Sequence, residues 1–161
     1  MAAINNITFT FPSVPLLTQS SDFKDTLFCD KNNLPESCNG VKLCPCVHRI
    51  KIKLGSVVEL IIVDESPTVQ SVYHPFHLHG FESSIIGLGQ SNDPRPMTLT
   101  RALQMRRARN FIAPTSKNYV LKDTVSIPSK GFAIFRFRAD NPGFWLLHCH
   151  YEWHMAGGMA L

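Results

Sequence analysis

Two strands and the turn between them can be read in the stretch Thr124-Val-Ser-Ile-Pro-Ser-Lys-Gly-Phe-Ala-Ile-Phe-Arg-Phe-Arg138. Thr124–Ile127 and Phe132–Arg138 are rich in β-branched and aromatic residues, and Pro128-Ser-Lys-Gly131 between them is a turn signal. Runs of the same kind recur at 7–11, 57–63, 72–79, 83–87 and 143–150. Short strands separated by polar turns predict an all-β sandwich.

Two further segments predict local features of this sandwich. From His48 onward, Ile50, Ile52 and Leu54 alternate with charged residues, which predicts a half-buried strand in a hairpin with 57–63. Thr98–Arg109 carries apolar residues at helical spacing behind a threonine that can cap, and predicts one short helix in a long connection. His48 begins the amphipathic strand with no second ligand nearby, so we interpret it as a core residue.

Length, composition and charge exclude several classes of protein. The 161 residues suit one domain or a piece of a larger protein, and 44% hydrophobic residues are enough for a core. The formal charge of +4 is too small to predict nucleic-acid binding. No apolar run approaches the roughly 20 residues of a membrane span, and residues 1–17 do not resemble a signal peptide. Neither nucleic acid nor a membrane is therefore an expected partner.

The expected organisation is an irregular Cys- and Pro-rich segment at 1–47 that leads into a domain at 48–161. Four of the five cysteines lie in the first segment: Cys29, Cys38, Cys44 and Cys46. Their spacing lacks the paired Cys-x-x-Cys knuckles of many zinc sites, so it favours two disulfides, with three connectivities open. Disulfides indicate a secreted protein, and the sequon Asn6-Ile-Thr8 is compatible with secretion but common by chance. Reduced buried thiols in a cytosolic chain are the alternative.

Six of the seven histidines fall in two motifs, His74-Pro-Phe-His-Leu-His-Gly80 and His148-Cys-His-Tyr-Glu-Trp-His154. Side chains alternate faces along an extended chain, so His77 and His79 share one face and His74 can take the other. The same alternation separates Cys149 from its two histidine neighbours. The ligands therefore sort into two sets, one of His74, Cys149, His154 and Met159, the other of His77, His79, His148 and His150.

The two sets differ in chemistry. Two imidazoles, one thiolate and one thioether are the ligands of a blue-copper electron-transfer centre with a weak axial Met. Four imidazoles on one surface suit copper ions that bind and reduce oxygen, although zinc or iron would also accept them. Because Cys149 lies between His148 and His150, an electron at its thiolate has a short through-bond route to the second set. Glu152 either orients a ligand histidine or is simply solvated.

These motifs, together with Arg138-Ala-Asp-Asn-Pro-Gly143 and Gly158-Met159, resemble those of the multicopper oxidases, and more closely the insect laccases. The resemblance spans most of the chain and implies a Greek-key cupredoxin sandwich. It also implies a protein that couples one-electron oxidation of a donor to four-electron reduction of O2 to water. The residues that it implies as copper ligands are His74, Cys149 and His154 at type 1, with Met159 axial, His77 at type 2, and His79, His148 and His150 at type 3.

Two departures from the family pattern accompany this resemblance. The family's trinuclear site takes eight histidines, four of them from His-x-His motifs of its first domain, whereas this chain has seven in all and two of these belong to type 1 copper. The family also continues well beyond the axial Met, which here stands two residues before Leu161. We therefore expect the C-terminal part of a longer oxidase, without its N-terminal cupredoxin domains and without the closing segment of the sandwich.

Three hypotheses for function follow. The leading one is a secreted laccase-like oxidase in which a donor delivers electrons near His154 and Cys149 passes them on. The donor class, whether diphenol, ascorbate or ferrous iron, is left open by the sequence.

The second hypothesis is a mononuclear copper-binding or electron-transfer module without oxidase activity. The third is an oxidase assembled across chains, with the remaining histidines supplied by another subunit. Trp145 and Trp153 are expected to pack against the sandwich, and bordering a donor pocket is the alternative.

Overall fold

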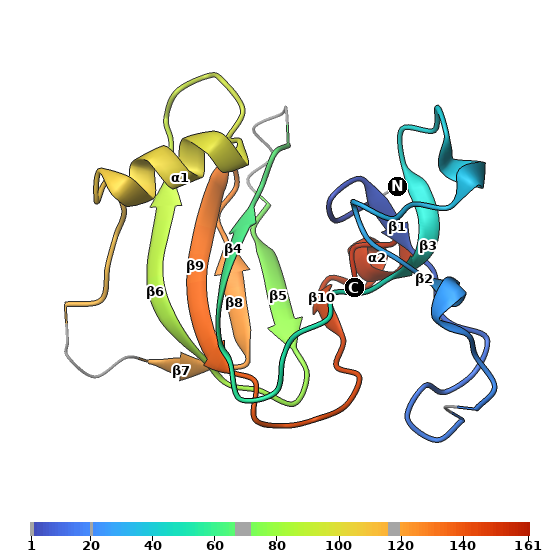
Figure 1. Cartoon of the computed structure of the whole chain (residues 1–161). Coiled ribbons are helices and arrows are strands. Elements are labelled where there is room, and N and C mark those ends of the chain that lie inside the picture. The colour runs from blue at the N-terminus through green and yellow to red at the C-terminus, as the bar shows by residue number, and fades with distance from the viewer. Residues whose placement is uncertain (1, 20, 67–71, 116–119) are drawn as a thin grey trace. The chain divides into compact units, whose positions relative to one another are not determined.

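The computed structural model describes residues 2–19, 21–66, 72–115 and 120–161 (Figure 1). It divides the chain into two compact units, the first formed by Met1–Lys53 with Pro142–Leu161 and the second by Leu54–Asn141. Most of the regular structure in the described residues is strand, and the two α-helices there are short. This confirms the prediction of an all-β protein.

An antiparallel sheet of four strands forms the centre of the second unit. In sheet order the strands are β4 (Val57–Val63), β9 (Gly131–Arg138), β6 (Ser83–Gln90) and β7 (Leu121–Lys122). β9 pairs with both flanking strands along most of its length, and its Phe132 and Ile134 are fully buried in a cluster with Met97 and Ala102. The predictions at 57–63, 83–87 and 132–138 are therefore confirmed.

A second strand pair in this unit carries the first histidine motif. β5 (His74–Leu78) pairs antiparallel with β8 (Thr124–Ile127), with His74 opposite Ile127 and His77 opposite Thr124. Phe76, between the two histidines, is buried, as expected where side chains alternate faces. The pairing thus fixes which way each histidine of β5 points.

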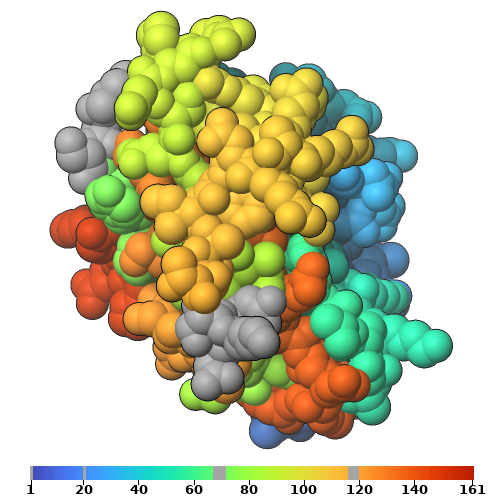
Figure 2. Space-filling view, turned by 90° about the vertical axis from the view of Figure 1, so that its left-hand side faces the viewer, coloured from blue at the N-terminus to red at the C-terminus, as the bar shows by residue number. Residues whose placement is uncertain are grey.

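Helix α1 (Leu99–Arg107) lies in the connection between β6 and β7, where the sequence predicts it. The hydroxyl oxygen of Thr98 accepts a hydrogen bond of 3.2 Å from the backbone N–H of Arg101, which caps the helix. Ala102 packs with Met97 and two residues of β9 in a fully buried cluster. Figure 2 shows the yellow segment around α1 on the surface of the molecule.

The first unit contains a parallel three-stranded sheet in the order β1 (Ile7–Phe9), β3 (Cys44–His48) and β2 (Phe28–Cys29). Disulfides join Cys29 to Cys46 and Cys38 to Cys44, and these four cysteines cluster with buried Ile7. The remaining elements are the 3₁₀ helices η1 (Asp25–Leu27) and η2 (Glu36–Cys38), strand β10 (Leu147–Cys149) and helix α2 (Glu152–Ala156). The preference for two disulfides over zinc is confirmed.

The hairpin predicted from His48 to Val63 is wrong. His48 is the last residue of β3, and the chain from there to Ser56 forms no strand. Ile50, Ile52 and Leu54 are 46%, 43% and 60% exposed, so their alternation with charged residues does not mark a buried face. The charged partners of this alternation are engaged elsewhere, since Lys51 pairs with Asp25 at 2.9 Å. His48 is 3% exposed, as its interpretation as a core residue predicts.

Candidate metal centre

One loop of the first unit carries Cys149, His154 and Met159. β10 ends at Cys149, α2 carries His154, and Met159 follows Gly158, whose φ of +104° favours glycine. The backbone N–H of Cys149 donates to Met159 O at 3.0 Å, and that of Met159 donates to His154 O at 2.9 Å. Backbone hydrogen bonds between Leu147 and Leu161 continue this pairing. The backbone of the loop thus ties the three predicted ligands to one another.

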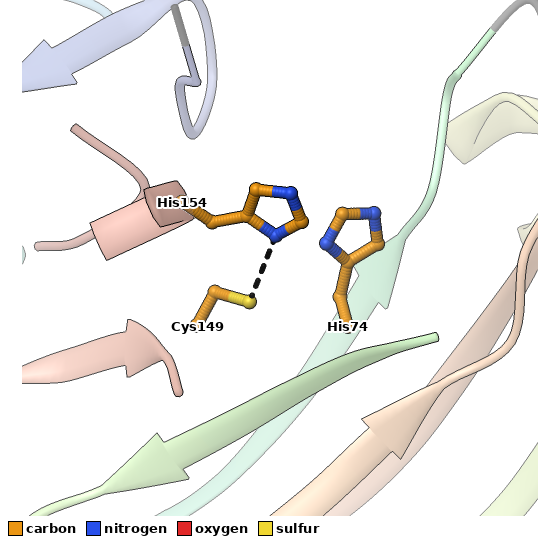
Figure 3. Close-up of side chains that lie close together, drawn as sticks. All are labelled: His74, Cys149 and His154. Atoms are coloured by element: carbon orange, nitrogen blue, oxygen red, sulfur yellow. Dashed lines mark hydrogen bonds between the residues drawn. The ribbon is translucent and has the colours of Figure 1, made fainter. Parts of the chain in front are cut away.

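The side chains of Cys149 and His154 point toward each other, and Cys149 Sγ lies 3.5 Å from His154 Nδ1 (Figure 3). Cys149 is fully buried and is the one cysteine among the described residues that forms no disulfide. Burial raises the pKa of its thiol, while a hydrogen bond from the backbone N–H of Tyr151 lowers it. A bound cation would favour the thiolate, because it supplies the opposite charge that this buried sulfur lacks.

Aromatic side chains surround His154 on its own helix turn. The ring of Tyr151 contacts the His154 ring edge to face, with 5.5 Å between ring centroids. Trp153 is 89% exposed, so the prediction that it packs against the sandwich is wrong. The reason is its position in α2, a five-residue helix without a buried residue. Trp145 is partly buried, as a packing residue would be.

The second histidine motif also places His148 and His150 side by side, with 5.5 Å between their ring centroids. The Nδ1 of buried His148 lies 3.0 Å from the carbonyl oxygen of Cys149. A carbonyl only accepts hydrogen bonds, so Nδ1 carries the proton and Nε2 carries the lone pair that a metal needs.

The histidines of β5 and His79, which directly follows this strand, lie in the second unit. The rings of His77 and His79 are 4.6 Å apart between centroids, as the alternation of faces predicts. The Nδ1 of His77 lies 3.2 Å from the carbonyl oxygen of Asp123 and 3.1 Å from the hydroxyl of Thr124. Because the carbonyl only accepts, Nε2 of His77 is again the nitrogen with the lone pair.

His74, which Figure 3 also labels, has an acidic neighbour that sequence reasoning missed. Its Nε2 lies 3.9 Å from Oδ1 of Asp64, a carboxylate at the end of β4 that is 8% exposed. Buried carboxylates are rare unless they have a partner. An Asp directly after the β-branched run of β4 was therefore the one sequence feature that could have pointed to this contact. The eight predicted ligands divide between the units, with His74, His77 and His79 in the second and the other five in the first.

Comparison with known proteins places these features in one class. A multicopper oxidase from Campylobacter jejuni, described as a metallo-oxidase, has a similar fold at a TM-score of 0.50 and 24% identity over 70% of this chain and 19% of that one. The fold is thus that of a cupredoxin-like domain, as predicted. Residues 9–161 match the Multicopper oxidase family, and the chain belongs to this family. Copper is the cofactor of the family.

Plant laccases are among the curated relatives. Laccase-11 and Laccase-10 of Arabidopsis thaliana are 34% and 33% identical to this chain, covering 99% and 100% of it. The chain spans 28% of the length of each. These relatives do not support the narrower resemblance to insect laccases.

Among the described helices, none has the length and apolar character that crossing a membrane requires.

Proposed function

We propose that this chain is the part of a laccase-like oxidase that holds the type 1 copper and half of the oxygen-reducing copper site. The observation that carries the proposal is the loop of the first unit, in which the buried sulfur of Cys149 lies 3.5 Å from His154 Nδ1 and the backbone ties both residues to Met159. His74 is the fourth proposed ligand, assigned from its sequence motif. Copper would supply one-electron redox chemistry there.

The donor atoms in this loop fit copper better than other metals. The set combines a thiolate, imidazole nitrogens and a thioether, which suits copper and which zinc sites rarely match. Burial of Cys149 excludes water from the sulfur, so the thiolate depends on a cation for its charge balance. Met159 is assigned the axial position.

The residues on either side of Cys149 provide the proposed route for electrons. His148 and His150 are joined to it by single peptide links, and the carbonyl of Cys149 accepts a hydrogen bond from His148 Nδ1. This hydrogen bond supports a second path of few atoms between the thiolate and an imidazole ring. We assign His79, His148 and His150 to the type 3 copper pair and His77 to type 2.

The donor is proposed to be a phenol or a similar one-electron reductant. Such a donor needs proximity and a suitable potential rather than a positioned acid or base. It would deliver electrons near His154, where Tyr151 and the exposed Trp153 offer aromatic surface. O2 is the proposed acceptor, and the remaining histidine ligands are proposed to come from N-terminal cupredoxin domains of the longer protein.

Secretion is proposed from the two disulfides. Pairs of this kind persist in oxidising compartments and are rare in the cytosol.

A second function, a mononuclear electron-transfer module, is favoured by one observation. Three of the four proposed type 1 ligands belong to a single loop of one unit, and the fourth, His74, is in the same chain, so this chain carries the full proposed type 1 set. Catalytic oxygen consumption by the purified 161-residue chain would contradict this second candidate.

The leading proposal is tested with Cys149→Ser in the full-length oxidase. The variant should lose both the blue colour and turnover, because a serine hydroxyl does not replace the thiolate as a ligand. Met105→Leu, at a partly buried methionine of α1 in the second unit, is the control and should keep both. A Cys149→Ser protein that stays blue would end the assignment.

A further inference from the structure

A pocket of about 300 Å³ opens in the second unit, where the end of β6 meets the turn between β8 and β9. Its lining residues are Tyr73, Gln90, Ser91, Asn92, Asp93, Ser129 and Lys130. The volume lies at the lower end of the range for small-molecule sites. Apart from the ring of Tyr73, which is 49% exposed, the lining is polar or charged. None of these residues belongs to the proposed copper site.

Lys130 is the unusual member of this lining. It is 7% exposed, although lysine is among the side chains least often buried without a partner. Its ammonium donates one hydrogen bond, of 3.1 Å, to the carbonyl oxygen of Pro94. No carboxylate of the described residues forms an ion pair with it. An ammonium group has three donors, so Lys130 retains capacity to bind an acceptor in the pocket.

Two carboxylates near Lys130 are already engaged, Asp93 in the lining and Asp64, which accepts its backbone N–H. Asp93 accepts from Arg95 Nε at 3.0 Å and pairs with Arg101 at 3.1 Å, and the hydrogen bonds from Arg95 hold the pKa of Asp93 well below its usual range. Asp64 accepts from the backbone N–H of Lys130 at 2.8 Å and from that of Ser66 at 3.1 Å. Both carboxylates are thus held by donors other than the ammonium of Lys130, which leaves that ammonium as the cationic donor of the lining.

The backbone holds Lys130 in place. Its φ of +51° is in the left-handed region, and the hydrogen bond from its N–H to Asp64 fixes this turn. Gln90 adds a second tie, because its side-chain amide donates to the carbonyl oxygen of Ser129 at 2.9 Å. A buried cation on a fixed turn is organised before any ligand arrives, which reduces the entropic cost of binding.

We propose that this pocket binds a small aromatic carboxylate. Its carboxylate would accept hydrogen bonds from Lys130 Nζ and from the amide of Asn92, and its ring would lie against Tyr73. The buried ammonium of Lys130 favours an anionic group, and the ring of Tyr73, the one aromatic residue of the lining, favours a flat apolar body over an inorganic ion. The proposed binding needs no copper, so its test is independent of the test of the oxidase function.

Calorimetric titration of the full chain with benzoate, which resists one-electron oxidation, tests the proposal. A dissociation constant on the order of 1 mM is expected for a ligand of this size. Lys130→Gln should weaken benzoate binding at least tenfold. Lys122→Gln, an exposed lysine of β7 outside the pocket, should change it less than twofold. Tyr73→Ser should weaken the binding of benzoate at least fivefold and the binding of phosphate less than twofold.

Several results would overturn the proposal. Absence of benzoate binding at about 20 mM, twentyfold above the expected dissociation constant, rejects the site. If Lys130→Gln binds benzoate as tightly as the unchanged protein does, Lys130 is not the cation that binds the carboxylate. Phosphate binding as tightly as benzoate rejects the aromatic selectivity. If circular dichroism shows that Lys130→Gln does not fold, the Tyr73→Ser titration decides, because Tyr73 is half-exposed and its loss leaves the turn intact.

Discussion

The Nε2 of His74 lies 3.9 Å from Oδ1 of Asp64, and Oδ2 of the same carboxylate accepts the backbone N–H of Lys130. The first distance is too long for a direct hydrogen bond but suits a bridging water. Asp64 therefore links the end of β4 both to the turn before β9 and to the ring of a proposed copper ligand. This relationship was not visible in the sequence.

Asp64→Asn should lower the free energy of unfolding by about 1–3 kcal/mol, because one amide oxygen cannot replace two carboxylate oxygens and a backbone N–H would be left unpaired. Urea unfolding of the chain measures this change. Asp140→Asn, at an exposed position, is the control and should change stability by no more than about 0.5 kcal/mol. Equal stability of Asp64→Asn and the unchanged chain would show that these hydrogen bonds are dispensable.

Met159→Leu should keep the blue colour and raise the reduction potential of the copper. The axial ligand tunes the potential, and removing a sulfur donor disfavours the oxidised ion. Redox titration of the copper-loaded protein measures the shift. Met155→Leu, four residues earlier in α2, is the control and should leave the potential unchanged. A potential that does not rise in Met159→Leu would exclude Met159 from the axial position.

The ion pairs of Asp25 lead us to expect that the fold loses stability in acid. Hydrogen bonds from Arg49 and Lys51 lower its pKa to about 2. The folded state therefore binds this proton less readily than the unfolded state does. The contribution to stability is fully present above the usual carboxyl pKa of about 4, and it is lost as the pH falls through 2.

Thermal unfolding between pH 5 and pH 2 tests this prediction. Asp25→Asn should lower the melting temperature at pH 5 and bring it close to that of the unchanged chain near pH 2. Asp22→Asn is the control, since Asp22 accepts a hydrogen bond from Ser21 rather than from a cation. Parallel curves for Asp25→Asn and the unchanged chain would contradict the assignment.

The strands of the second unit could be predicted from local sequence, because β4, β6, β8 and β9 are apolar runs closed by turn residues. Helix α1 was predictable for a similar reason, since Thr98 caps it and Ala102 marks its buried face. Helix α2 was missed, because five residues are too few to show a helical period. The parallel sheet of β1, β3 and β2 was missed as well, because its pairing joins segments far apart in the sequence.

Predictions about the site divide in the same way. Alternation along an extended chain predicted which histidine rings are neighbours, His77 with His79 and His148 with His150, while their roles as copper ligands stay predictions. The disulfide connectivity was left open, because pairing depends on the fold and not on spacing. Asp64 was missed because its contact with His74 joins residues too far apart in the sequence for local patterns to describe.

The visible absorption spectrum of the purified, copper-loaded chain, with copper counted per chain, tests the central claim most directly. The account predicts an intense charge-transfer band of the blue-copper kind with about one copper per chain, lost in Cys149→Ser. Copper bound at that ratio without the band, or with a band that survives Cys149→Ser, would contradict a thiolate-ligated type 1 site.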